Sequence, residues 1–172
     1  MIREKYITNH LSRFTSYSYA KISRTVSRTA FQAGRMLERE LYDSMRIQYG
    51  VPASGTEIIE AVNPLEAGLS AEVSFTKGCY VGQEVIARID SYGKLQKRLS
   101  RFIVTGTVEP RLLPGAPMFL GEAEVGKITS AARAQGSHGA VALGFLRTSV
   151  EAEEFRLPPY NGLQELSCRL FQ

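Results

Sequence analysis

The chain has 172 residues, of which 44% are hydrophobic and 22% charged, and a formal net charge of +4. This length allows one generous domain or two small ones, large enough to bury a core without disulfides or metals. No segment has the roughly 18 apolar residues of a membrane span, and two cysteines without a C-x-x-C motif exclude a zinc finger or a disulfide scaffold. We therefore expect a soluble protein of a reducing compartment.

Positive charge is concentrated in the N-terminal part of the sequence. Residues 1–46 hold nine Lys or Arg against four Asp or Glu, and residues 5–35 contain no acid. Arg-rich, Ser-rich and acid-poor composition is typical of an organelle transit peptide. The edge of a larger fold whose usual partners are absent has the same composition, and we favour that interpretation over a transit peptide. A basic RNA-binding arm with stacking tyrosines is a third interpretation, which we favour less than either. We expect a cytoplasmic protein, or one of an organelle matrix if residues 1–34 are a transit peptide.

Residues 35–48 are predicted to form an amphipathic helix, because apolar side chains recur there at spacings of three and four. Gly50 would end this helix, and Pro52 would prevent it from continuing. Arg46, near the end of the helix, is either a surface cation or a cation directed into a pocket. The apolar residues that carry the pattern are Met36, Leu37, Leu41, Tyr42 and Met45.

A connector rich in proline and glycine follows the helix over residues 51–69. Within it we expect a short extended run at 57–62 and a turn at Asn63-Pro64. A second extended piece is predicted at 73–75, and apolar spacing predicts a short helix over 82–92.

The remaining part of the sequence has the pattern of a small β domain. A basic cluster of Lys94, Lys97, Arg98 and Arg101 is interpreted as the solvated face of a turn that enters the first strand. Five or so short strands separated by Gly- or Pro-containing turns suggest an antiparallel barrel or sandwich. The predicted strands are 101–105, 117–120, 123–129, 140–146 and 166–171.

The stretch from Lys77 to Glu84 is denser in chemical groups than any other part of the chain. It contains a cation, a thiol, two glycines, an amide and a carboxylate directly before an apolar run. We interpret it as a reactive motif loop. Its members are Lys77, Gly78, Cys79, Tyr80, Val81, Gly82, Gln83 and Glu84.

Cys79 is the candidate nucleophile of this loop. It precedes the predicted helix 82–92, whose unpaired N–H groups and positive dipole end favour a thiolate, and Lys77 adds a nearby cation. A small cysteine buried at a tight packing point is the structural alternative. One thiolate cannot hold an iron–sulfur cluster, which needs about four ligands, unless a partner supplies the others. Cys168 lies in a strand-like run and is expected in the core.

Two segments resemble a known family. Residues 63–69 (NPLEAGL) and 75–88 (FTKGCYVGQEVIAR) closely resemble the signature of the YgfZ family of folate-binding proteins, which are related to the glycine-cleavage T-protein, an aminomethyltransferase. Residues 125–130 and 142–145 look like the C-terminal barrel of that family. Residues 45–52 look like a segment where relatives carry an Arg-Ile-Glu-x-Gly pattern, with Gln48 in the place of the acid.

The resemblance implies an α+β fold, a remnant of the aminomethyltransferase folate-binding domain followed by a small antiparallel β-barrel. Family members are about twice as long, so the chain would correspond to their C-terminal half. The implied domains are a basic Ser/Thr-rich segment at 1–34, the C-terminal part of a folate-binding-type domain at 35–94, and the barrel at 95–172.

The resemblance also implies an accessory role in the assembly or repair of iron–sulfur clusters, including those of tRNA-modifying enzymes. Cys79 and Lys77 would carry the reactivity, tetrahydrofolate would be the cofactor, and Arg46 and Glu66 would be residues of its pocket. Cys79 would contact a cluster transiently, together with a partner, and no resident metal site is implied.

The implied partners are iron–sulfur assembly or client proteins and a missing N-terminal half or second subunit. Neither a membrane nor direct nucleic-acid contact is expected. A tetrahydrofolate-dependent aminomethyltransferase and a truncated, non-catalytic interaction module remain as alternatives, so it stays open whether the chain is an enzyme.

Overall fold

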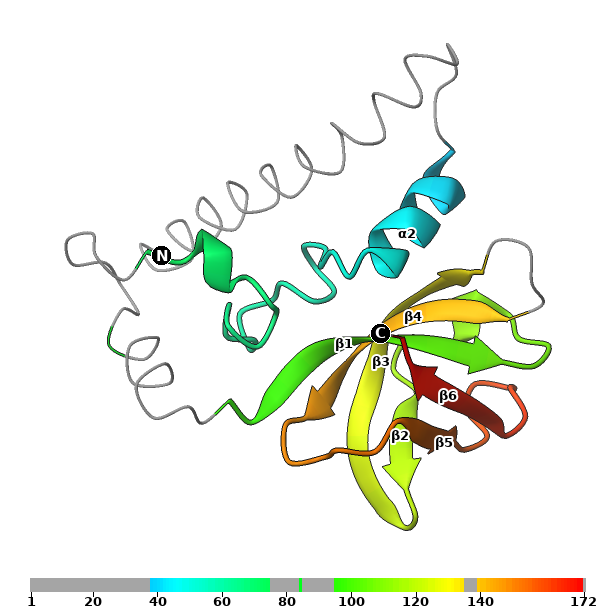
Figure 1. Ribbon diagram of the computed structural model, residues 1–172. Helices are drawn as coiled ribbons and strands as arrows, with labels where there is room; N and C mark the ends of the chain where they lie inside the picture. The colour runs from blue at the N-terminus through cyan, green and yellow to red at the C-terminus, as the bar shows by residue number, and fades with distance from the viewer. Residues whose placement is uncertain (1–37, 75–83, 85–94, 135–138, 172) are drawn as a thin grey trace.

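The structure is a computed structural model that describes residues 38–74, 84, 95–134 and 139–171. Among these residues an α-helix, α2, precedes a β domain (Figure 1). Within the described ranges, no helix is long and apolar enough to cross a membrane. The elements are α2 (Arg39–Gln48), short 3-10 turns at Ser70–Glu72 and Pro110–Leu112, and the strands β1 (Lys97–Thr105), β2 (Pro117–Leu120), β3 (Ala123–Arg133), β4 (Ala140–Arg147), β5 (Glu154–Leu157) and β6 (Leu166–Leu170).

The strands close into an antiparallel barrel with the order β1-β4-β3-β2-β5-β6. Alternate side chains of the strands point inward and form the main core, which includes Phe102, Met118, Ile128 and Phe155. The predicted α+β fold with a small antiparallel barrel is confirmed, and the closed order excludes the sandwich. The sequence pattern did not predict β5, which has only four residues and lies directly before Pro158.

A β-bulge interrupts the pairing of β3 with β4. Ile128 pairs with Gly144 and Ser130 pairs with Leu143, so Thr129 is an extra residue on β3. A bulge bends the strand and breaks the regular alternation of side chains between the two faces of a sheet. As a result, the neighbouring residues Thr129 and Ser130 can direct their hydroxyl groups to the same side.

α2 lies against β3 and β4. Ile47 is buried there in a small cluster with Ala132 and Leu143, and Ser44 Oγ donates a hydrogen bond of 3.1 Å to the carbonyl oxygen of Arg133. The helix predicted over 35–48 is confirmed for Arg39–Gln48, while Glu38 is extended and precedes the first turn.

The end of α2 is a Schellman motif at Gly50. The Gly50 N–H donates to the carbonyl of Ile47 at 3.0 Å, and the Val51 N–H donates to the carbonyl of Arg46 at 2.8 Å. Gly50 has a φ of 72°, a left-handed conformation that glycine adopts without steric cost. The predicted stop at Gly50 is therefore confirmed.

The connector at 51–69 is a series of turns, and the extended run predicted for 57–62 is wrong. Residues 55–57 form a turn closed by an isolated bridge between Ser54 and Ile58, and Glu57 points out of this turn toward the barrel. The predicted turn at Asn63-Pro64 is confirmed, because Asn63 Oδ1 accepts the N–H of Leu65 at 2.9 Å. The helix predicted for 82–92 lies outside the described residues except for Glu84.

Candidate functional site

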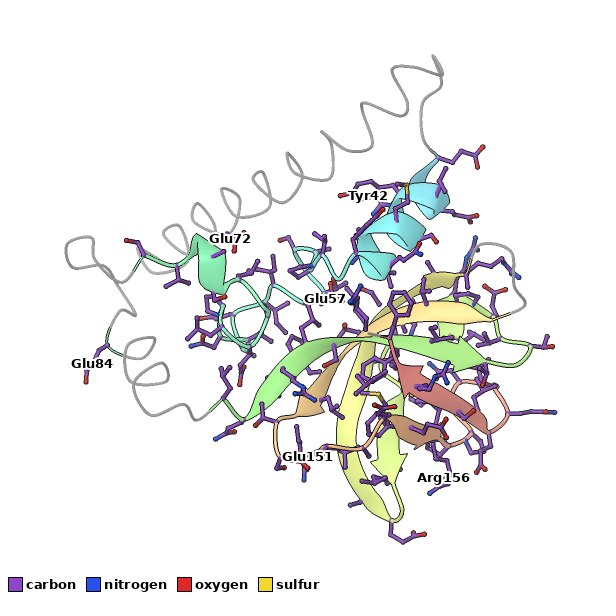
Figure 2. All side chains as sticks on the ribbon, in the orientation of Figure 1. Tyr42, Glu57, Glu72, Glu84, Glu151 and Arg156 are labelled. Carbon is purple, nitrogen blue, oxygen red and sulfur yellow. The ribbon has the colours of Figure 1, made fainter. Side chains whose placement is uncertain are left out.

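Most of the motif loop predicted from the sequence, residues 77–83, lies outside the described part of the structure. The roles predicted for the members of this loop therefore stay predictions. These members are Cys79, Lys77, Gly78, Tyr80, Gly82 and Gln83. Glu84 is described: it is helical and exposed, and Figure 2 shows its side chain pointing outward.

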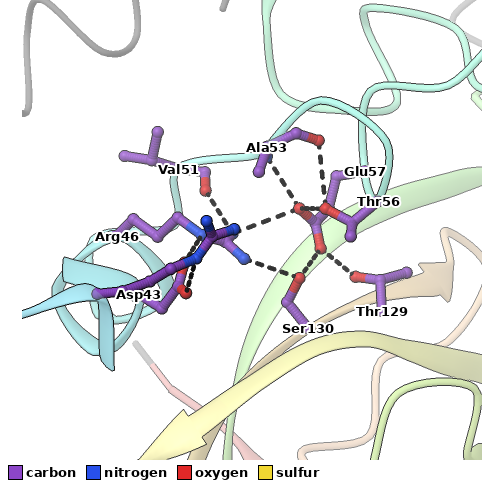
Figure 3. A network of polar contacts seen from close by, with 9 residues as sticks. Asp43, Arg46, Val51, Ala53, Thr56, Glu57, Thr129 and Ser130 are labelled. Carbon is purple, nitrogen blue, oxygen red and sulfur yellow. Dashed lines mark hydrogen bonds and ion pairs between the residues drawn. The ribbon is translucent and has the colours of Figure 1, made fainter. Parts of the chain in front are cut away.

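The described residues contain a buried polar cluster where α2, the connector and β3 meet (Figure 3). We call it the helix–barrel cluster and define it as Arg46, Glu57, Thr129 and Ser130. Burying charged groups is costly unless they are paired and hydrogen-bonded. The partners of each group therefore decide what this cluster can do.

Glu57 is the centre of the helix–barrel cluster. Its side chain is 0% exposed, and one carboxylate oxygen, Oε2, accepts hydrogen bonds from the Ala53 N–H at 2.9 Å and the Thr56 hydroxyl at 2.7 Å. The same oxygen lies 3.4 Å from Nη1 of Arg46. The other oxygen, Oε1, accepts hydrogen bonds of 2.6 Å from the hydroxyls of Thr129 and Ser130. This carboxylate is saturated with donors and closed to solvent.

Arg46 supplies the opposite charge, with 9% of its side chain exposed. Its Nε donates to Asp43 Oδ1 at 2.9 Å, Nη1 donates to the carbonyl of Val51 at 3.3 Å, and Nη2 donates to Ser130 Oγ at 3.0 Å. Because Ser130 accepts from Arg46 and donates to Glu57, it also links the two charges indirectly. The planar fork of the guanidinium suits this divergent set of acceptors, which a lysine could not serve in the same way.

The bulge in β3 supplies both hydroxyl donors to Glu57. Thr129 Oγ1 lies 2.6 Å from Glu57 Oε1 and 3.2 Å from the carbonyl oxygen of Leu143. A hydroxyl carries one proton, so the shorter contact to the carboxylate takes it. The extra residue in β3 thus completes the hydrogen bonding of a buried anion.

Glu66 lies outside the helix–barrel cluster, in the connector beside the start of β1. Its carboxylate accepts the N–H of Asn63 at 3.3 Å and lies 3.8 Å from Nζ of Lys97, while its carbonyl accepts the N–H of Leu99 at 2.8 Å. These contacts fix the connector to β1. Within the described residues, no hydrogen bond or ion pair joins Glu66 to Arg46, and the role of both in folate binding stays a prediction.

Cys168 is 2% exposed on β6, which confirms that it is a core residue. Removal from water raises the pKa of its thiol to about 12. The described part of the basic cluster lies on β1, where Lys97 lies over the ring of Phe145 and Arg101 over the ring of Phe171. In the described ranges, no group of three or more His, Cys, Asp or Glu is placed to hold a metal ion.

Sequence reasoning missed Glu57. It was assigned to an ordinary extended run, and nothing in its neighbours distinguishes it from a surface acid. Its buried partners belong to the segments 45–52 and 125–130, two of the segments on which the family resemblance rested. Another of these segments, 142–145, contributes Leu143, which packs against Ile47. The fold therefore brings these three distant segments together.

Comparison with known proteins gives a consistent set of relatives, although no family model matches the chain. The chain is 35% identical over 106 residues to the putative transferase At1g60990, chloroplastic, of Arabidopsis thaliana, covering 62% of this chain and 24% of that protein. It is 36% identical over 69 residues to an aminomethyltransferase of Caldanaerobacter subterraneus, covering 40% and 18%. It is 42% identical over 69 residues to the human iron-sulfur cluster assembly factor IBA57, mitochondrial, covering 38% and 19%.

The fold has a solved counterpart as well. The glycine cleavage system aminomethyltransferase T of Bartonella henselae matches 77% of this chain with a TM-score of 0.63 and 18% identity, covering 37% of that chain. The matched segments thus span about a quarter or less of the three sequence relatives and little more than a third of the solved one. The chain is similar in sequence to aminomethyltransferases and to IBA57, and its fold is that of part of an aminomethyltransferase.

Proposed function

We propose that the chain is a folate-binding accessory protein of the YgfZ type that acts in the assembly or repair of iron–sulfur clusters, including those of tRNA-modifying enzymes. The observation that carries this proposal is the cysteine-containing sequence Lys77–Glu84 in a chain that is 42% identical over 69 residues to an iron–sulfur cluster assembly factor.

In this proposal Cys79 is the group that contacts a cluster or its sulfur. Lys77 stabilises the thiolate, and Gly78, Tyr80, Gly82, Gln83 and Glu84 shape the loop. One thiolate provides one of about four ligands, so an assembly or client protein supplies the others during a transient contact. Relatives are described as mitochondrial and as chloroplastic, so an organelle matrix stands beside the cytoplasm as the proposed location.

The reactivity of Cys79 tests this proposal in the intact chain. Alkylation of the native protein at increasing pH should report one reactive thiol, because Cys168 is buried and stays protonated until about pH 12. We expect an apparent pKa for Cys79 clearly below the ordinary value of about 8.5, and a higher one in the variant Lys77→Met. A Cys79 pKa of about 8.5 or more in the unmodified chain would contradict an activated thiol.

The iron–sulfur role itself is tested by cluster delivery. The chain is added to a reconstitution of an apo iron–sulfur protein, and the absorbance and activity of the client are followed. Cys79→Ala should remove the stimulation, whereas Cys168→Ala, provided that it remains folded, should keep it. Equal stimulation by the Cys79→Ala variant would exclude Cys79 as the cluster-contacting residue.

The similarity to aminomethyltransferases favours a second candidate, a tetrahydrofolate-dependent aminomethyl transfer. Calorimetric titration with tetrahydrofolate tests the cofactor that both candidates share. Tetrahydrofolate-dependent turnover that persists in Cys79→Ala would favour the transferase over the accessory protein.

The surface of α2 favours a third candidate, a non-catalytic interaction module. Leu41 and Tyr49 are large apolar side chains on this helix and at its end, 37% and 64% exposed. Such a surface is typical of a protein contact, here with a second subunit or an N-terminal half that carries more of the aminomethyltransferase-like fold. Binding of the chain to that half, without turnover or cluster delivery, would favour this candidate.

A further inference from the structure

α2 buries one apolar residue, Ile47, against the barrel and leaves two larger apolar side chains, Leu41 and Tyr49, exposed. At 3.6 residues per turn, Leu41, Met45 and Tyr49 form a stripe on a different side of the helix from Ile47, and Met45 in this stripe is half-buried. Ser44 and Ile47 are 5% and 1% exposed against the barrel, whereas Leu41 and Tyr49 are 37% and 64% exposed. An amphipathic helix on a globular domain normally turns its apolar side inward. Burial of Ile47 is therefore only part of what sets the rotation of this helix about its axis.

The helix–barrel cluster is the other contact that sets this rotation. Arg46 lies on the same half of α2 as Ile47, and its guanidinium reaches Glu57 and Ser130. Glu57 is itself held by the connector and by the two hydroxyls of the β3 bulge. If α2 turned its apolar stripe toward the barrel, Arg46 would leave Glu57, and a fully buried carboxylate would lose its counter-ion. That state is strongly disfavoured.

We infer that Arg46 and Glu57 are a positioning pair that fixes the rotation of α2 on the barrel and keeps the Leu41–Met45–Tyr49 stripe directed outward. The pair also sets the direction of Gln48, which is exposed at the end of the helix. The inference about ligand binding rests on the proposed folate function: Arg46 acts on a ligand through the helix end that it orients, because its own guanidinium is committed to protein acceptors.

Hydroxyl-radical footprinting with mass spectrometry tests the positioning role without any ligand. The variant Arg46→Met/Glu57→Leu removes both charges together, so neither is left unpaired, and Ser44→Ala is the matched control that removes another contact between α2 and the barrel. We expect the double variant to keep barrel labelling at Phe102 and to change the ratio of labelling at Tyr49 to that at Ile47 at least threefold. Ser44→Ala should keep the ratio of the unmodified chain.

Two changes in labelling would support the inference, and one result would overturn it. A fall in Tyr49 labelling means that the helix has rotated to bury its stripe, and a rise in Ile47 labelling means that it has left the barrel. Both support the pair as the element that fixes α2. An unchanged ratio in a double variant with a protected barrel would overturn the inference.

Tetrahydrofolate affinity, measured by calorimetry, tests the link to function. If the unmodified chain binds, the double variant should bind about tenfold more weakly or worse, while Ser44→Ala stays within about twofold. A changed footprint with unchanged affinity would leave the pair as a positioning element for the stripe and overturn its role in ligand binding. If the unmodified chain does not bind, the folate part of the proposed function fails, and the footprint alone decides the positioning role.

Discussion

The thiol of Cys168 lies inside the barrel, next to the aromatic ring of Phe155 across the β5–β6 pairing. Loss of water around it raises its pKa from the ordinary value to about 12. In the unfolded chain the same thiol is in water and ionises near its ordinary pKa of about 8.5. The folded state therefore holds the proton over a pH range in which the unfolded state has lost it.

This difference predicts a pH dependence of stability. Because the folded pKa is the higher one, the free energy of unfolding contributed by Cys168 is fully present below about pH 8.5 and falls as the pH rises toward about 12, by up to about 1.4 kcal/mol per pH unit. Urea unfolding at pH 8, 9, 10 and 11 measures it. The contribution of the thiol is isolated by comparing the unmodified chain with Cys168→Ala.

In Cys168→Ala the alkaline loss of stability should be smaller, although the variant is less stable at neutral pH because it leaves a small cavity. Parallel curves for the two proteins would show that the thiol does not titrate differently in the folded and unfolded states.

At the scale of elements, the contact between β3 and β4 depends on glycine at position 144. A Cβ atom at Gly144 would lie 2.6 Å from the carbonyl oxygen of Lys127 and 3.2 Å from Cα of Ile128, both in the backbone of the neighbouring strand. Backbone in the middle of a barrel cannot yield as a flexible side chain does. We expect Gly144→Ala to lower the free energy of unfolding by about 3 kcal/mol, the upper part of the range for overpacking, as measured by urea unfolding.

Gly55→Asn is the control for this prediction. Gly55 has a φ of 83°, and a Cβ atom added there would have no neighbouring atom within 4 Å, so only its left-handed conformation matters. Asn tolerates that conformation, and the expected loss is below about 1 kcal/mol. If both variants lost equal stability, steric contact across the strands would not be the cause at Gly144.

Local signals explain which elements the sequence could predict. Runs such as 117–120 and 140–146 are apolar, short and bounded by glycine or proline, and the strands form there. The helix at 35–48 was predicted from its period, but its orientation on the barrel was not. That orientation depends on the contacts of Arg46 with Glu57 and Ser130, and Ser130 is 84 residues away in the sequence.

Glu57 shows the same limit more strongly. Its hydrogen bonds to Thr129 and Ser130 span 72 and 73 residues. The backbone there is closed into a turn by hydrogen bonds from the N–H groups of Glu57 and Ile58 to the carbonyl of Ala53, and the distant bonds hold the Glu57 side chain, so the local β pattern gave the wrong prediction. The motif loop is the opposite case: its residues were found from local sequence alone, and the structure does not describe their placement.

On the scale of the whole molecule, the barrel and α2 rest on cores of different size. The barrel core is continuous and contains, for example, the edge-to-face pair Phe102–Phe155 with ring centroids 6.0 Å apart. The core under α2 consists of Ile47, Ala132 and Leu143 with partly buried neighbours. Regions with few buried apolar contacts open at lower free energy than the rest of a protein, so α2 should open while the barrel stays closed.

Native-state hydrogen exchange of the variant Ile47→Ala tests this view. Truncating a buried isoleucine costs about 2–5 kcal/mol, and a loss of about 2 kcal/mol in the opening of α2 alone would speed exchange of the Gly50 and Val51 amides about 30-fold. The amides of Phe102 and Val104 on β1 should keep their protection, because the barrel core does not include Ile47. In Phe102→Leu, by contrast, exchange should rise in both places, since α2 has no surface to dock on once the barrel opens. Equal acceleration at β1 and α2 in Ile47→Ala would mean that helix and barrel unfold as one cooperative unit, and that the helix–barrel cluster ties them together more tightly than the apolar contacts alone imply.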